Sequence, residues 1–225
     1  MTSSVPGYLS WTIIFVSVAI LLARILLPIG RSASHSERLV TYALGFGILA
    51  AVFREEKAQD LLSDHAGLSI GFTRQLGTTM IVMAFVPFVL LVSAWVRSRV
   101  SDRWSMETPI WVAGYVSVLL MLLLGGHARS LGQYIDRTAG WQTVAYFSIF
   151  SVWCAAVGGP LVVVTVSELR RGHLRGKHIA TYVVILVAGA WTAEEAASIF
   201  ASSVLAATGT GEQFVEFRFA ANENN

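Results

Sequence analysis

Two adjacent glutamates, Glu194 and Glu195, lie inside the last long apolar segment of the chain, which runs from Ile179 to about Ala207. A carboxylate at the centre of a membrane helix costs roughly 2.5–3.5 kcal/mol on insertion scales. Such residues usually face a partner, a cavity or a substrate. Because neighbouring helical residues point about 100° apart, we expect one glutamate to face the bundle interior and to be needed for activity. The other is then dispensable.

Other ionisable residues lie where earlier apolar segments end. At about 1.5 Å per residue, Glu194 lies about 22 Å along its segment, in the outer third of a hydrocarbon core about 30 Å thick. The same count gives Arg54, Glu55, Arg74 and His127 a similar depth. We therefore expect one ionisable layer near the outer face, in which Arg54 or Arg74 pairs with one of the two glutamates.

This layer has three interpretations: a ring of wetted interfacial charges, a polar cavity open to the outside, or a metal site. The spacing of histidines and acidic residues matches no metal motif, and the sequence contains no phosphate loop, HExxH or GxSxG motif. We therefore predict neither a metal nor a cofactor. The catalytic candidates are the two glutamates, and the predicted ligand-binding set is Arg54, Glu55, Arg74, His127, Glu194 and Glu195.

The composition indicates a membrane protein. Of 225 residues, 55% are hydrophobic and 13% are charged, and the mean hydropathy is +0.63; soluble domains carry about 25% charged residues. The charges are gathered between long apolar runs, so the fold class we predict is an all-α integral membrane protein. The single cysteine, Cys154, excludes an internal disulfide and is expected to be a small core or lipid-facing residue.

The apolar runs predict a bundle of six transmembrane helices, with seven as the alternative. Residues 1–207 form the predicted membrane domain, and residues 208–225 form a polar tail that is the place for any further span. We expect a polar loop over residues 58–71, a kink at Pro87, a break at residues 158–160, and close helix packing around Ala193. The six predicted spans cover approximately residues 8–30, 39–53, 72–96, 108–126, 141–166 and 179–207.

The basic residues predict the orientation. Nine Lys and Arg residues fall in the first, third and fifth loops, against four in the second and fourth. Positively charged loops stay in the cytoplasm, so we expect the odd-numbered loops inside the cell and both termini outside. The cluster from Arg170 to Lys177 is interpreted as a topology determinant, with contact with anionic lipid as the secondary interpretation.

A resemblance is carried by Phe53 and Arg54, the acidic stretch through Asp60 and Asp64, and the long span that begins near Arg74. Over about the first hundred residues, this layout resembles a family of uncharacterised actinobacterial multi-pass membrane proteins labelled as transporters. Members of that family tend to have a seventh span and a cytosolic C-terminal domain, neither of which we expect in these 225 residues. The family implies no catalytic residue.

Three functions remain open. The first is a transporter of a small molecule or ion, or a membrane sensor, with an outward-facing polar cavity. The second is an intramembrane enzyme that acts on a lipid or isoprenoid with a buried glutamate as general acid. The third is an accessory or structural subunit whose charges pack against a partner. The partners we expect are membrane lipid and a small apolar or ionic ligand, with no nucleic acid; a protein partner is left unspecified.

Overall fold

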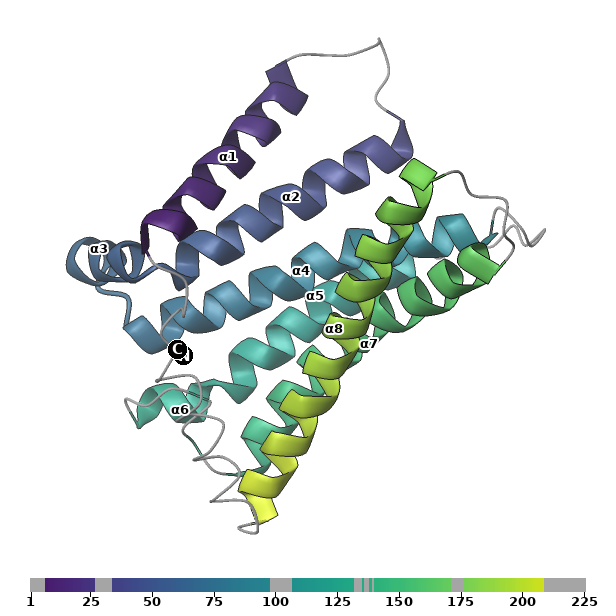
Figure 1. The fold of residues 1–225 in the computed structure, drawn as a ribbon. Helices are drawn as coiled ribbons and strands as arrows, with labels where there is room; N and C mark the ends of the chain where they lie inside the picture. The colour runs from purple at the N-terminus through teal and green to yellow at the C-terminus, as the bar shows by residue number, and fades with distance from the viewer. Residues whose placement is uncertain are drawn as a thin grey trace.

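The computed structural model describes residues 7–26, 34–97, 107–131, 135, 138, 140–170 and 176–208. In this part of the chain the regular elements are helices, and no strand occurs (Figure 1). The helices are α1 (Gly7–Leu26), α2 (His35–Arg54), α3 (Glu56–Ala66), α4 (Ile70–Arg97), α5 (Glu107–Leu124), α6 (Gly126–Ser130), α7 (Trp141–Arg170) and α8 (Gly176–Thr208). The predicted all-α class is confirmed.

A capping box sets the start of α2. The Ser34 side chain accepts a hydrogen bond from the backbone N–H of Glu37, and the Ser34 N–H donates to the Glu37 carboxylate at 2.6 Å. Two backbone donors of the first turn are thereby satisfied. The helix begins at His35, four residues before the predicted span. Residues 35–38, which were expected to belong to the first loop, therefore form its first turn.

The segment predicted as a polar loop over residues 58–71 is largely a helix. It forms α3, which ends at Gly67 in the left-handed conformation, with φ 64°. Its polar residues are mostly exposed, and Gln59 is its buried residue. The loop prediction was wrong because a short amphipathic helix has a low mean hydropathy, which hides its periodic apolar positions.

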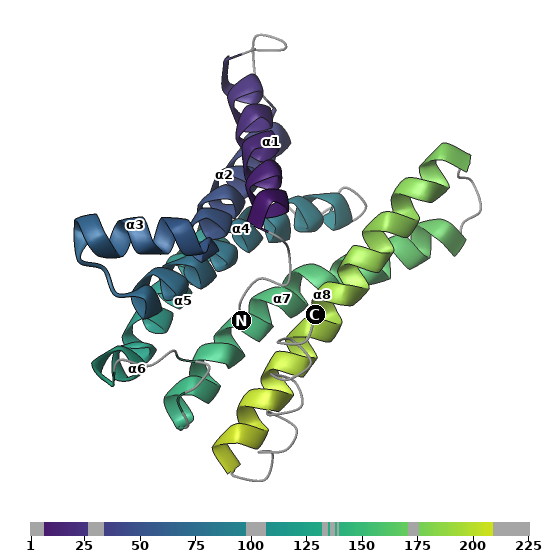
Figure 2. The ribbon, with the colours of Figure 1, turned by 60° about the vertical axis from the view of Figure 1, so that its left-hand side comes forward.

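Helix α4 lies at the centre of the bundle. It packs against α2, α5 and α7, while α1 packs on α2 and α8 packs on α7 (Figures 1 and 2). The last residues of α1, α4 and α7 and the first residues of α2, α5 and α8 lie at one end of the bundle, which we call the His35 end; α3 and α6 lie at the other, which we call the α3 end. The buried core joins α2, α4, α5 and α7 through Leu39, Val82, Val86, Leu90, Met121, Tyr146 and Trp153.

The predicted break at residues 158–160 is absent. Helix α7 continues through Pro160, as α4 continues through Pro87. Gly158 instead marks the closest approach of α8: a Cβ at this position would lie 2.8 Å from the Gly189 carbonyl oxygen and 3.0 Å from the Ala193 nitrogen. The small residues of α7 and α8 therefore serve close helix packing, as predicted around Ala193.

Five helices of the described part are long and apolar enough to cross a membrane. They are His35–Arg54, Ile70–Ala94, Glu107–Ser130, Trp141–Arg170 and Ile179–Leu205. The apolar part of α1, Ser10–Leu26, is shorter. The structure thus agrees with a polytopic membrane protein, but it does not confirm the predicted count of six or seven spans.

Candidate functional site

The two glutamates lie at mid-length of the α7–α8 pair. Glu195 is half-buried in the α7–α8 pair, in the neighbourhood of Cys154 of α7, whereas Glu194 is exposed. Next to them, the Ser151 hydroxyl donates to the Ala196 carbonyl at 3.0 Å. Cys154 lies thirteen residues, or about 20 Å, from the first residue of α7. The glutamates are therefore nearer the middle of α7 than the outer third predicted from the sequence.

The exposed face of α8 consists of large apolar residues and one carboxylate. Val184, Val187, Trp191 and Glu194 fall within an arc of about 80° at 100° per residue. Trp191 is 70% exposed and Val184 67% exposed. Glu194 has no hydrogen bond or ion pair with any other residue that the structure describes. This face, which we call the α8 outer face, combines an apolar surface with a carboxylate that has no partner within the described chain.

Arg54 and Arg74 lie at the α3 end, in a network centred on Gln59. Arg54 is the last residue of α2, and its side chain packs against Gly77 of α4. The Gln59 amide donates to the Phe53 carbonyl at 2.9 Å, and its oxygen accepts from Arg74 Nε at 3.4 Å. Gln59 is 2% exposed, so this amide joins the ends of α2, α3 and α4. Glu55, half-buried, forms the extended link between α2 and α3.

A second buried amide, Gln75, joins α4 to α5 and α6. Its NH₂ group donates to the Met121 carbonyl at 2.8 Å, and its oxygen accepts from Arg129. Arg129 also donates to the Leu122 carbonyl at 3.0 Å, and its guanidinium lies 5.2 Å from the centre of the Phe72 ring. These donors add hydrogen bonds to carbonyls in the last turn of α5, where the Met121 carbonyl also accepts from the Gly125 backbone N–H at 3.0 Å.

His127, the histidine predicted to belong to the site, is exposed on α6. The side chain that turns inward from this helix belongs to Arg129. Sequence reasoning missed Gln59 and Gln75, because it ranked residues by charge and treated amides as neutral, and it missed Arg129, because it counted this residue only as a loop charge. A glutamine inside a periodic apolar pattern, such as Gln75 beside the buried Thr73 and Thr79, is the signal that could have identified them.

The structure divides the predicted ionisable layer into two groups. Arg54, Glu55 and Arg74 come together at the α3 end, with His127 on α6 at the same end. The glutamates lie on α8, which packs along α7 and makes at most marginal contact with the other described helices. The predicted arginine–glutamate pair is therefore not formed at Glu194. Among the described residues, no group of three or more His, Cys, Asp and Glu side chains could hold a metal ion.

No family model, curated protein or solved structure matches this chain. Over the residues that the structure describes, the fold defines an all-helical class with five helices capable of crossing a membrane. Its candidate site is the glutamate pair on α8, which lies at mid-length of two membrane-length helices.

Proposed function

We propose that the protein is a polytopic protein of the cell membrane with six spans, which are the five membrane-length helices together with α1. Helix α1 has 20 residues, or about 30 Å at 1.5 Å per residue, which equals the thickness of a hydrocarbon core. Most of its exposed side chains are apolar, including Phe15 at 66% and Leu26 at 71%. In this arrangement the basic odd-numbered loops lie in the cytoplasm.

The function best supported is that of an accessory subunit whose α8 outer face binds a helix of another membrane protein chain. The observation that carries this proposal is Glu194: an exposed carboxylate near the middle of a membrane-length helix, with no partner in the described chain. Ionisable residues in membrane helices almost always face protein or a water-filled cavity. A neighbouring helix that offers a hydrogen-bond donor or a cation supplies that environment.

The packing of α8 supports the same proposal. In the most apolar 18-residue stretch of α8, only 11% of the residues are buried, compared with 50% in the corresponding stretch of α4. Lipid alone could cover Val184 and Val187, but it gives the carboxylate no hydrogen-bond donor in the hydrocarbon region. The α8 outer face thus differs from the exposed faces of α1 and α5, which are apolar without a carboxylate at mid-length.

Glu194→Ala tests the proposal. Wild-type protein extracted from its native membrane in a mild detergent is expected to migrate on a native gel well above its 24.4 kDa chain mass, and Glu194→Ala is expected to migrate as the free subunit. Glu194→Gln keeps a hydrogen-bonding side chain and should retain part of the complex. Glu56→Gln, at an exposed carboxylate of α3, is the matched control and should leave the complex intact. A complex that survives Glu194→Ala would contradict the proposal.

The transporter or sensor is the second candidate, and the observation in its favour is Glu195. Glu195 is half-buried in a closely packed helix pair rich in small residues, and ionisable residues inside membrane bundles are typical of ion or substrate pathways. For this function, Glu195→Gln should abolish ligand binding or ion-coupled uptake while the complex stays assembled. Retained binding with loss of turnover would instead support the lipid-modifying enzyme.

A further inference from the structure

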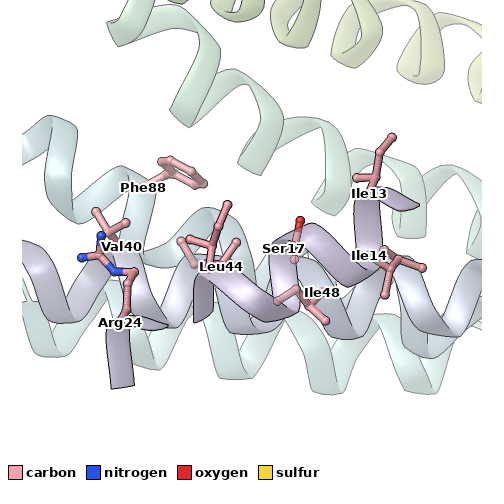
Figure 3. A pocket seen from close by; sticks show the side chains of 12 residues that line it. Ile13, Ile14, Ser17, Arg24, Val40, Leu44, Ile48 and Phe88 are labelled. Carbon is pink, nitrogen blue, oxygen red and sulfur yellow. The ribbon is translucent and has the colours of Figure 1, made fainter. Parts of the chain in front are cut away.

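An elongated apolar groove lies between α1 and α2, away from the α8 glutamates. Its volume is about 490 Å³, within the range of about 300–1,000 Å³ that is typical of small-molecule sites. Arg24 and Val40 lie at one end and Ile13 and Ile14 at the other, with Leu44, Ser17 and Ile48 between them (Figure 3). Phe88 of α4 completes the lining.

The lining is apolar except for Ser17 and Arg24. From α1 it takes residues 13, 14, 17, 20 and 24, which are one face of a helix at spacings of three and four. From Ile13 to Arg24 this face extends about 16 Å at 1.5 Å per residue. A long, narrow apolar surface with one cation at its end is complementary to an amphiphile with one anionic head.

Arg24 has only neutral acceptors within the described chain. Its Nε donates to the Thr41 hydroxyl at 3.4 Å, and its Nη2 donates to the Glu37 carbonyl at 3.3 Å. The Glu37 carboxylate is held by the Ser34 N–H at the start of α2. No ion pair of Arg24 is formed among the residues that the structure describes. The guanidinium is exposed and is available to an anion at the groove end.

We propose that the groove binds one anionic phospholipid, with the phosphate at Arg24 and an acyl chain along the α1–α2 lining towards Ile13. Arginine is suited to this role, because its guanidinium forms bidentate hydrogen bonds with phosphate oxygens. Arg24 lies two residues before the end of α1, where a long side chain reaches the headgroup layer. The phosphate lies at the His35 end, which faces the cytoplasmic leaflet in the orientation proposed above.

Native mass spectrometry of the full chain in detergent micelles tests the proposal, with phosphatidylglycerol and phosphatidylcholine of equal chain length as the two probes. One phosphatidylglycerol is expected to stay bound to the wild type in preference to phosphatidylcholine. Arg24→Gln should lower that preference about tenfold, the effect of losing one charge-assisted pair, and Arg24→Lys should keep most of it. Lys57→Gln, at an exposed basic residue of the α3 end, should have no effect.

Two glycine variants form a matched pair that tests the acyl-chain part of the groove. A Cβ at Gly47, which lines the groove, would have no heavy atom within 4 Å, and neither would one at Gly45, which does not line it. Gly47→Leu should fill the groove and release both lipids, whereas Gly45→Leu should release neither. The proposal is overturned if Arg24→Gln keeps the wild-type preference, or if Gly47→Leu retains lipid. The proposal is also overturned if Gly47→Leu changes the mass of a protein complex and does not release lipid, because the groove would then be a protein interface.

Discussion

At the scale of single residues, the position of one Cβ decides how α7 and α8 pack. Gly158 and Gly159 are adjacent and identical in type, but only Gly158 lies against α8. A Cβ at Gly159 would have no heavy atom within 4 Å, whereas a Cβ at Gly158 would lie 2.8 Å from the Gly189 carbonyl oxygen. The requirement for glycine at 158 is therefore steric and comes from the neighbouring backbone, which cannot move aside as a flexible side chain could.

This difference predicts opposite effects of two alanine substitutions. Gly158→Ala should force α7 and α8 apart and lower the free energy of unfolding by about 1–3 kcal/mol, as overpacked cores do. Gly159→Ala should be neutral or stabilise by up to about 1 kcal/mol, since alanine favours helix over glycine. The reaction of a fluorogenic maleimide with Cys154, the single, buried cysteine, reports unfolding on heating. Equal melting temperatures for the two variants would refute this assignment.

At the scale of elements, buried amides hold the short helices at the α3 end. Gln59 anchors α3 through the Phe53 carbonyl and Arg74, and Gln75 anchors the α5–α6 turn through the Met121 carbonyl and Arg129. Each glutamine uses its donor on a helix-terminal carbonyl and its acceptor on an arginine. Arg74 and Arg129 would by themselves suggest an anion-binding site. Their guanidinium groups instead donate hydrogen bonds that connect helices.

Gln59→Leu is expected to release α3 from the bundle. The substitution preserves helix propensity but leaves the Phe53 carbonyl and the Arg74 guanidinium without this partner, at a cost of about 1–3 kcal/mol. Hydrogen exchange over Glu56–Ala66 should speed up while exchange in α4 stays slow. Asp60→Ala, at the exposed neighbouring position, is the control. Unchanged exchange in Gln59→Leu would show that α3 is held by its apolar contacts alone.

At the scale of the whole molecule, the two ends of the bundle are chemically different. The His35 end carries the capping box of α2, the contact between His35 and Glu107 at 3.6 Å, and Arg24. The α3 end carries the amide networks and the two short helices. The orientation proposed from the loop charges makes the His35 end cytoplasmic and the α3 end extracellular.

Cysteine labelling of intact cells measures that orientation. On a Cys154→Ser background, Ser36→Cys at the His35 end should resist a membrane-impermeant maleimide until the cells are opened. Asp64→Cys at the α3 end should react from outside; both positions are exposed. Labelling of Ser36→Cys in intact cells, with protection of Asp64→Cys, would invert the proposed topology.

The sequence alone determined the all-helical class and the approximate positions of five apolar helices, because length and hydropathy are local properties that a bilayer selects directly. It also pointed to Glu194 and Glu195, since a carboxylate in an apolar run stands out without any knowledge of its neighbours. The residues that surround these two glutamates in space could not be predicted from the sequence in the same way. Equal distances along separate helices did not determine proximity: α8 packs mainly on α7, with at most marginal contact with the other described helices, and no Arg54 or Arg74 pair forms at Glu194.

Tertiary contacts also decided what the glycines and glutamines do. Gly158 was expected to break α7, but the backbone of α8 lies against it and gives it a packing role. Gln59 and Gln75 gained their roles from carbonyls near the ends of α2 and α5, to which their side-chain amides donate. The groove that ends at Arg24 exists only because α1 and α2 pack side by side. Each of these features depends on atoms from two or more helices, and their relative placement is set by packing across the bundle.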